Sequence, residues 1–215
     1  MSAHLHLLNA SGRLSPYIEN IKEAFTECVD IVSVLLPVKD VDVVVRAGRR
    51  VIPEIGIGGF SPSAEAVYLT MDPDNPHFQD SLEREFVPIL GHELHHCARH
   101  SGPGYGHLLG EALVTEGLAC HFETELRGGA APFYAHALDE VALQAVTARA
   151  LDALECSYDH RSWFFGATAQ NLPRHAGYSL GFRIVGRYLA DCGTLASHSW
   201  AVPARDVLVL GLQTF

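Results

Sequence analysis

Five consecutive residues, His92-Glu93-Leu94-His95-His96, restrict the fold of this chain more than any other segment. They match the pattern H-E-x-x-H, in which two histidines stand four residues apart and a glutamate follows the first. On a helix, residues four apart lie on one face, about one turn from each other. Both imidazoles can then bind one zinc ion, and the carboxylate of Glu93 can reach a water molecule at the metal. The pattern therefore requires a helix through His92–His96.

The residues around the motif support such a helix. We predict that it starts at residue 80 or 81, where Asp80 and Glu83 resemble a capping box, and continues to about His100. The sequence Gly-Pro-Gly at residues 102–104 predicts its end. Pro88 lacks a backbone N–H group, so we expect the helix to kink or to start again just before the motif.

A match to so short a pattern also arises by chance in a chain with 13 histidines, so a third ligand is needed. A catalytic zinc has three protein ligands and one open position. We predict a second helix over Leu109–Leu126, which ends before two glycines at residues 128–129. Glu116 falls on a stripe of otherwise apolar residues, where a carboxylate is costly unless it is paired or bound to metal. Glu116 is therefore the candidate third ligand.

Two other residues of this helix are alternatives. Glu111 lies near the helix start, where the helix dipole favours an acidic side chain, and that role is enough to explain it. Cys120 could bind zinc as a thiolate, but it lies a full turn from Glu116.

These residues resemble the gluzincins, the zinc peptidases that include thermolysin and the aminopeptidases related to it. Gluzincins pair H-E-x-x-H with a glutamate on the next helix, and the 19 residues between His96 and Glu116 are a typical gap. Val114–Ala119 is also similar to the segment around that glutamate in the aminopeptidases. Over roughly residues 40–190, the chain is more similar still to an uncharacterised bacterial family of predicted zinc-dependent proteases. The similar segments are His92–His96, Leu109–Glu123, Trp163–Gly166 and Gly177–Leu189.

The resemblance implies a role for each matched residue. His92, His96 and Glu116 would hold one zinc ion per chain, and Glu93 would be the general base. A side-chain donor would stabilise the oxyanion, and in gluzincins it is a Tyr or His well downstream of the glutamate ligand. Tyr178 is our candidate for this donor.

His175 is the second candidate for the oxyanion donor. Tyr105 and His107 are further candidates, because they lie in the glycine-rich loop between the two predicted helices. Tyr178 also has a purely structural explanation, as a half-buried tyrosine at a helix start whose hydroxyl bonds a backbone carbonyl.

The segment before the motif predicts a small sheet. The expected strands are His4–Asn9, Val41–Arg46, Ile55–Phe60 and Ala66–Met71, with a helix from Ser15-Pro16 to about Leu36 before the second of them. Val41–Arg46 is apolar and β-branched, which is typical of a buried strand. In the gluzincin plan, an edge strand of the sheet pairs with the substrate backbone. The substrate-binding residues predicted from this plan are Gly56, Ile57, Gly58, Gly59, Phe60 and His175.

The glycines at residues 56, 58 and 59 would let a peptide approach that strand closely, or they would mark a bulge. After Gly129 the chain is expected to be helical, with helices over Phe133–Glu155 and Tyr178–Asp191. We therefore predict an α+β fold in one zincin-like domain, residues 1–215. Its sheet-containing part covers about residues 1–101, and its helical part about residues 102–215.

Composition excludes several other classes. With 48% hydrophobic residues the chain can bury a core, and its formal charge of −10 argues against binding nucleic acid. No run of about twenty apolar residues predicts a membrane span, and no signal peptide is apparent. The five cysteines form no C-x-x-C pair and are odd in number, which favours reduced thiols and a cytoplasmic protein.

The sequence therefore predicts a cytoplasmic zinc peptidase that acts on a peptide or protein substrate. The alternative is a catalytically inactive zinc-binding protein that binds a peptide or protein partner; hydrolysis of a non-peptide amide is a third possibility. The preferred side chains, endo- versus exopeptidase action and the oligomeric state do not follow from the sequence.

Overall fold

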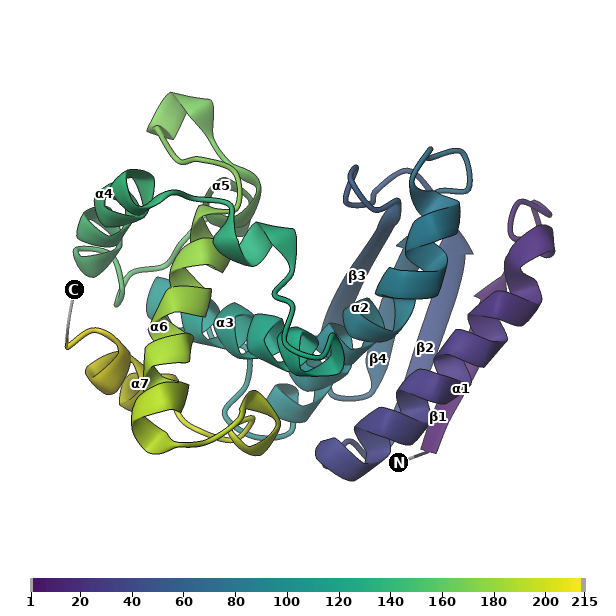
Figure 1. The fold of residues 1–215 in the computed structure, drawn as a ribbon, viewed down its shortest axis with the longest axis horizontal. Helices are drawn as coiled ribbons and strands as arrows, with labels where there is room; N and C mark the ends of the chain where they lie inside the picture. Colours follow the sequence, from purple (N-terminus) through teal and green to yellow (C-terminus); the bar gives the residue numbers. More distant parts are fainter. Residues whose placement is uncertain (1, 214–215) are drawn as a thin grey trace. The chain divides into compact units, whose positions relative to one another are not determined.

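The computed structural model describes residues 2–213 and has the α+β fold that the sequence predicts. The chain divides into two compact units, Met1–Ser101 and Gly102–Phe215. The first unit contains the sheet and two long helices, and the second unit is helical (Figure 1). Each unit is described by itself below.

The sheet of the first unit has four strands in the order β1-β2-β4-β3. Their bounds are β1 (Ser2–Leu8), β2 (Asp40–Ala47), β3 (Ile57–Ser63) and β4 (Ala66–Met71). The strands β1, β2 and β4 are parallel, whereas β3 runs antiparallel to β4. β3 is therefore an edge strand, and it precedes the motif helix with only β4 between them.

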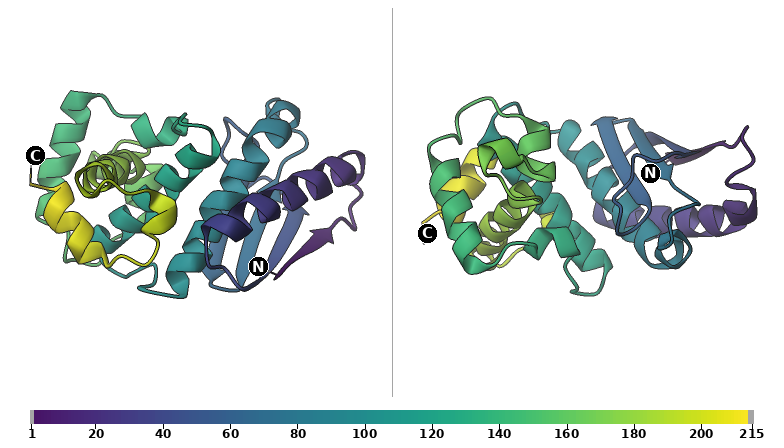
Figure 2. Two further views of the ribbon diagram at one scale, coloured as in Figure 1. Left: turned by 60° about the horizontal axis from the view of Figure 1, so that its bottom comes forward. Right: turned by 90° about the horizontal axis from the view of Figure 1, so that it is seen from above.

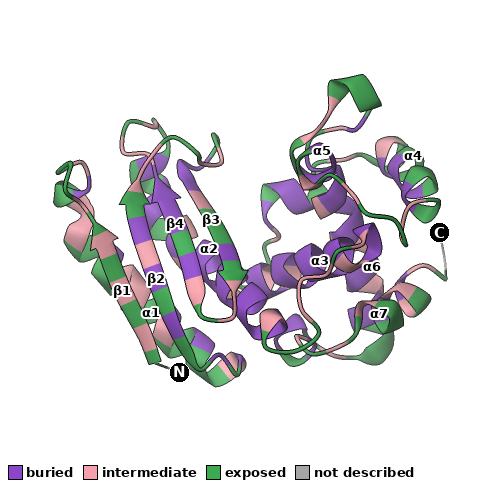
Figure 3. Ribbon diagram, turned by 180° about the vertical axis from the view of Figure 1, so that it is seen from behind, coloured by how far each residue is buried: buried purple, intermediate pink, exposed green. Residues whose placement is uncertain are grey.

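Two helices, α1 (Ile18–Leu35) and α2 (Phe78–His100), cover one face of this sheet (Figures 1 and 2). Along β2, only the residues of this face are buried, namely Val41, Val43 and Val45. The other residues of β2 are exposed or half-buried, and Figure 3 shows them in green and pink along the strand. The expected buried strand is therefore buried on one face alone, because Asp42, Val44 and Arg46 face away from the helices.

Both helices start differently from the prediction. A 3-10 turn, Ser15–Tyr17, precedes α1, so Pro16 lies in that turn rather than in the first turn of the α-helix. α2 begins at Phe78, which places Asp80 inside its first turn instead of at its cap. The helix continues through Pro88 without a fresh start. The residues that follow Pro88 up to residue 99 are all buried, and their packing offsets the hydrogen bond that proline cannot make.

The second unit begins with α3 (Leu109–Leu126), which has the bounds predicted from the sequence. Gly128 and Gly129 follow it with φ angles of 67° and 106°, a backbone conformation that glycine adopts without strain. The amide of Gly129 donates to the carbonyl of Thr124 at 2.9 Å and closes the helix end.

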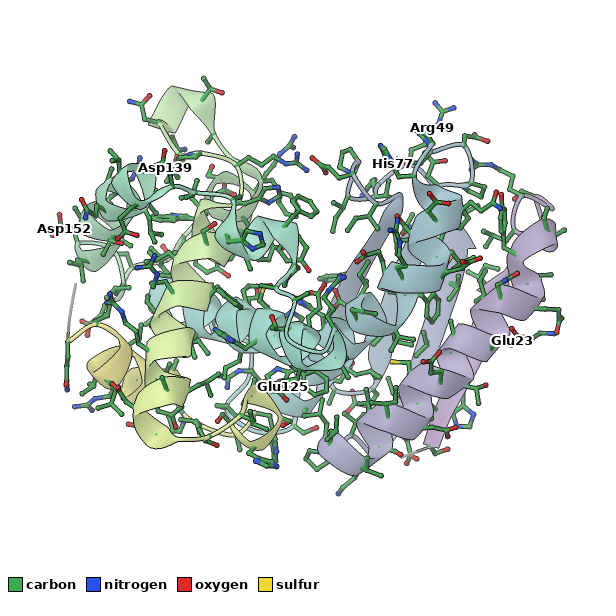
Figure 4. All side chains as sticks on the ribbon, in the orientation of Figure 1. Glu23, Arg49, His77, Glu125, Asp139 and Asp152 are labelled. Atoms are coloured by element: carbon green, nitrogen blue, oxygen red, sulfur yellow. The ribbon has the colours of Figure 1, made fainter. Side chains whose placement is uncertain are left out.

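The predicted helix over Phe133–Glu155 is wrong. The structure has a short 3-10 turn, Phe133–His136, and then α4 (Glu140–Leu151). Asp139 separates the two because its side chain accepts a hydrogen bond from the amide of Ala142 at 2.8 Å and caps α4. Figure 4 labels Asp139 and Asp152 at the two ends of α4.

Three more helices complete the second unit: α5 (His160–Phe165), α6 (Ala176–Cys192) and α7 (Ala204–Gly211). α3 and α6 pack closely, and Figure 3 shows both as largely buried. A β-carbon added at Gly117 would lie 2.3 Å from the carbonyl oxygen of Gly181, and one added at Gly181 would lie 2.3 Å from that of Leu113. The two helix backbones therefore touch at a point that only glycine permits.

We expect Gly117→Ala to destabilise the protein by about 1–3 kcal/mol, because the new methyl group meets backbone that cannot move aside. Helix propensity alone would predict the opposite sign, a gain of about 0.5–1 kcal/mol. Urea unfolding measures the difference. Gly186→Ala is the control, because its methyl group would meet only the His121 side chain, at 3.1 Å. Equal stability of the Gly117 variant and the wild type would contradict this account of the contact.

Among the helices of residues 2–213, none combines the length and the apolar character that crossing a bilayer requires.

Candidate metal centre

His92 and His96 lie one turn apart on α2, as the H-E-x-x-H pattern requires. Their ring centres are 4.7 Å apart and the rings are nearly perpendicular, at 85°. Both side chains are buried, with 7% and 5% of their surface exposed. Two imidazoles held side by side in a buried position suit the binding of one metal ion.

The side chain of Glu93 extends from α2 to the edge strand β3. The hydroxyl of Ser61 on β3 lies 2.7 Å from Oε2 of Glu93 and 2.9 Å from its backbone carbonyl oxygen. Gly59, two residues earlier on the strand, leaves the space that the Glu93 side chain occupies, since a β-carbon there would lie 2.3 Å from Oε1. The carboxylate therefore has a defined place against β3.

His100 continues the row of residues four apart, two turns after His92. The side chain is half-buried, and Nε2 of His100 lies 3.2 Å from the backbone carbonyl oxygen of Ser61. Burial lowers its pKa below the usual value, so a neutral ring that donates to this carbonyl is favoured near neutral pH. His95, by contrast, is fully buried.

Glu116 on α3 is 4% exposed, and it accepts a hydrogen bond at Oε1 from the hydroxyl of Tyr105. Burial raises the pKa of Tyr105 well above 10, and the carboxylate of Glu116 raises it further. Tyr105 is therefore protonated and serves as a donor. The hydroxyl of Thr115 donates to the backbone carbonyl of Tyr105 at 3.0 Å and fixes the loop that carries it.

Tyr158 and His160 belong to the same surroundings, and no motif in the sequence pointed to them. Burial raises the pKa of Tyr158 to about 12, with a second contribution from Glu116, while a hydrogen bond with Tyr105 works in the opposite direction. Nδ1 of His160 lies 3.5 Å from the hydroxyl of Tyr105. Besides Tyr105, the surroundings of the Glu116 carboxylate therefore include the phenol of Tyr158 and the imidazole of His160.

Glu111 has the structural role that its position suggests. Its Oε2 accepts hydrogen bonds from the backbone amides of His107 and Leu108, at 2.7 and 2.9 Å, and so caps the start of α3. His107 itself is exposed.

Two further residues of α3, His121 and Glu123, have partners within the second unit. Nε2 of His121 lies 2.9 Å from the carbonyl oxygen of Phe182, and the two rings stack. Glu123 is fully buried, pairs with Arg127 at 2.6 Å and accepts a hydrogen bond from the hydroxyl of Tyr134.

Tyr178 lies in the first turn of α6 and is half-buried. Its ring centre is 4.9 Å from that of Phe164 and 5.0 Å from that of Tyr134. It also adds to the raised pKa of Tyr105, after burial, Glu116 and Tyr158. His175 precedes α6 in the left-handed conformation, with φ of 67°, and its ring centre is 6.0 Å from that of Tyr178. The roles of both residues stay predictions.

The predicted substrate-binding segment, Gly56–Phe60, runs into β3 and includes its first residues. The pairing with β4 is irregular between Phe60 and Ser63, next to the glycines, so a distortion of the strand is present. Gly58 is close to the chain itself, since a β-carbon there would lie 3.1 Å from the carbonyl oxygen of Arg50. The glycines thus have structural contacts, and their role in substrate binding stays a prediction.

His92, His96 and Glu116 each offer one possible ligand atom, and these three atoms all lie within 4.8 Å of one another. Tetrahedral zinc with ligand bonds of about 2.0–2.1 Å separates its ligand atoms by about 3.3 Å, so the side chains need to close in by no more than about 1.5 Å to hold one ion. Two imidazoles and one carboxylate are also a ligand set that zinc takes with one position left open. These side chains could hold a metal ion; over residues 2–213 they form the one such group, without Cys120.

A family model described as "Predicted Zn-dependent protease (DUF2268)" matches residues 17–209. The match extends beyond residues 40–190, where the resemblance was seen in the sequence. No curated protein and no solved structure matches the chain.

Proposed function

We propose that this chain, which belongs to the family described as predicted Zn-dependent proteases, is a peptidase that uses one zinc ion per chain. The observation that carries the proposal is the group formed by His92, His96 and Glu116, with Glu93 next to the first ligand. A metal site with only a structural role has no need of an adjacent base. A buried carboxylate beside three ligands is typical of hydrolytic zinc sites.

In this proposal the imidazoles of His92 and His96 and the carboxylate of Glu116 hold the ion. Zinc bound there would polarise the scissile carbonyl and lower the pKa of the attacking water. Glu93 takes a proton from this water as the water oxygen bonds to the carbonyl carbon. The C–N bond then breaks, and Glu93 gives its proton to the leaving amine.

The oxyanion that forms on the carbonyl needs a hydrogen-bond donor. Tyr178 is our candidate, with His175 second. Tyr105 is also a donor, and its protonated hydroxyl already contacts Glu116. We assign Tyr105 the distinct role of orienting this ligand, because partners of metal ligands fix their geometry.

The substrate in this proposal is a peptide or protein segment in an extended conformation. β3 is an edge strand, so it has a row of backbone groups that can pair with an added strand. The carbonyl of Ser61 already accepts from His100, and the backbone groups of Gly56 and the carbonyl of Ile57 already bond within the chain, so pairing falls to residues 58–60.

The test is hydrolysis of a mixed peptide library by the zinc-loaded protein, with cleavage products identified by mass spectrometry. We expect cleavage that stops after a chelator removes the metal and returns with added zinc. Zinc binding without any cleavage would instead favour an inactive zinc protein that binds a peptide or protein partner.

Tyr105→Phe is expected to weaken zinc binding by about 10–100-fold, because Glu116 loses the donor that orients it. Competition with a chromophoric chelator measures the dissociation constant. Tyr17→Phe, which removes a hydroxyl in the 3-10 turn before α1, should leave the constant unchanged. Unaltered zinc affinity in the Tyr105 variant would remove Tyr105 from the metal site.

A further inference from the structure

The strand β3 has a second feature besides its place at the edge of the sheet: three of its residues face α2 where the motif lies. Side chains alternate along a strand, so residues 57, 59 and 61 share one face. Ile57 is fully buried there, Gly59 contacts Glu93, and the hydroxyl of Ser61 bonds Glu93. Phe60, between them, is 63% exposed on the other face. This face of β3 therefore fits the side chain of one carboxylate, Glu93.

Ser61 is bound to α2 at two points of the helix. Its hydroxyl lies 2.7 Å from the Glu93 carboxylate, and its backbone carbonyl lies 3.2 Å from Nε2 of His100, two turns further along. Ser61 is itself buried, with 6% of its surface exposed. A hydroxyl held in this way has few alternative orientations, so it restricts the carboxylate that it contacts.

Gly59 restricts Glu93 from the other side. A β-carbon at Gly59 would lie 2.3 Å from Oε1, 2.6 Å from Cγ and 2.7 Å from Cδ of Glu93. The backbone of Gly59 therefore lies against the length of the glutamate side chain, and any larger residue would displace it. Glu93 is 7% exposed in this position.

We infer that Ser61 and Gly59 are positioning residues that set the geometry of the general base from the edge strand. The inference rests on the proposed function, in which Glu93 transfers the proton. It adds that β3 holds Glu93 in place as well as pairing with the substrate. The same strand then positions both the substrate backbone and the general base. A proton transfer needs the base within about 2.6–3.2 Å of the proton donor, and a misplacement of about 1 Å can cost 100-fold in rate.

The test compares Ser61→Ala with Ser61→Thr, which keeps a hydroxyl, and with Ser63→Ala on the same strand. The Ser63 hydroxyl accepts only a local bond from the amide of Glu65, at 3.2 Å, so this variant makes the same chemical change away from Glu93. For each protein we would measure kcat, KM, zinc content and thermal unfolding. Ser61→Ala is expected to lower kcat by about 10–100-fold at unchanged KM and zinc content, with recovery in Ser61→Thr and no change in Ser63→Ala.

Gly59→Ala supplies a second variant in case Ser61→Ala does not fold, and the same pattern of lower kcat at retained zinc is expected. Loss of zinc together with activity in the Ser61 variant would overturn the inference, because it would indicate a structural role. Wild-type activity in both Ser61→Ala and Gly59→Ala would overturn it as well and leave the peptidase proposal standing. A zinc-loaded wild type that cleaves no peptide would overturn the proposed function, and the inference with it.

Discussion

Replacing Glu93 with glutamine is expected to lower kcat/KM for peptide hydrolysis by about 10²–10⁴-fold while zinc stays bound. Glutamine has nearly the size of glutamate and can keep the hydrogen bond from the Ser61 hydroxyl, which lies 2.7 Å from Oε2 in the native protein. Its amide cannot take a proton from water, so the loss isolates proton transfer from folding and metal binding. Initial rates on the best peptide from the library measure the loss.

Two checks make this result specific. Zinc content of the variant, by elemental analysis, should equal that of the wild type, because His92, His96 and Glu116 are intact. Glu83→Gln, an exposed substitution earlier on the same helix, should keep full activity. A Glu93→Gln variant that hydrolyses peptides at the wild-type rate would show that another group is the base.

Replacing Glu116 with alanine is expected to remove zinc from the purified protein. The ion would retain two of its three protein ligands, and the loss of a buried carboxylate also removes the charge that balances the metal. Elemental analysis after dialysis should give about one zinc per wild-type chain and far less for the variant. Activity should fall in parallel and return only in part at high zinc concentration.

Glu111→Ala is the matched control for this second prediction. It lies on the same helix, but its carboxylate caps the helix start through the amides of His107 and Leu108. We expect it to keep its zinc and to lose about 0.5–2 kcal/mol of stability with the cap. Zinc that stays with the Glu116 variant would place the third ligand elsewhere in the chain.

Local periodicity explains why the candidate ligands could be found from the sequence. A spacing of four residues places His92 and His96 together on any helix, and the bounds of α3 follow from its apolar stripe and the glycines after it. Glu116 was identified because a carboxylate on a buried stripe requires a partner. Each of these inferences depends only on residues within one helix.

The partners of these residues could not be predicted in the same way. Ser61 and Glu93 are 32 residues apart, and no spacing rule joins a strand hydroxyl to a helix carboxylate. Tyr105 was considered as an oxyanion donor, but its contact with Glu116 depends on how its loop folds back along α3. Such contacts depend on tertiary packing, and a local pattern in the sequence does not encode it.

The helix over Phe133–Glu155 was wrongly predicted for a related reason. Apolar residues continue through that segment, and the signal that interrupts it is one capping aspartate, Asp139. An Asp inside an apparently helical stretch can either face solvent or accept a backbone amide, and the sequence alone does not decide between the two.

The most direct test of the central claim is a crystal structure of the zinc-loaded protein with anomalous diffraction data collected on both sides of the zinc absorption edge. The account predicts one anomalous peak per chain, about 2.0–2.2 Å from a nitrogen of His92, a nitrogen of His96 and a carboxylate oxygen of Glu116. A zinc peak with other ligands, or none at these three residues in protein that retains zinc, would contradict it.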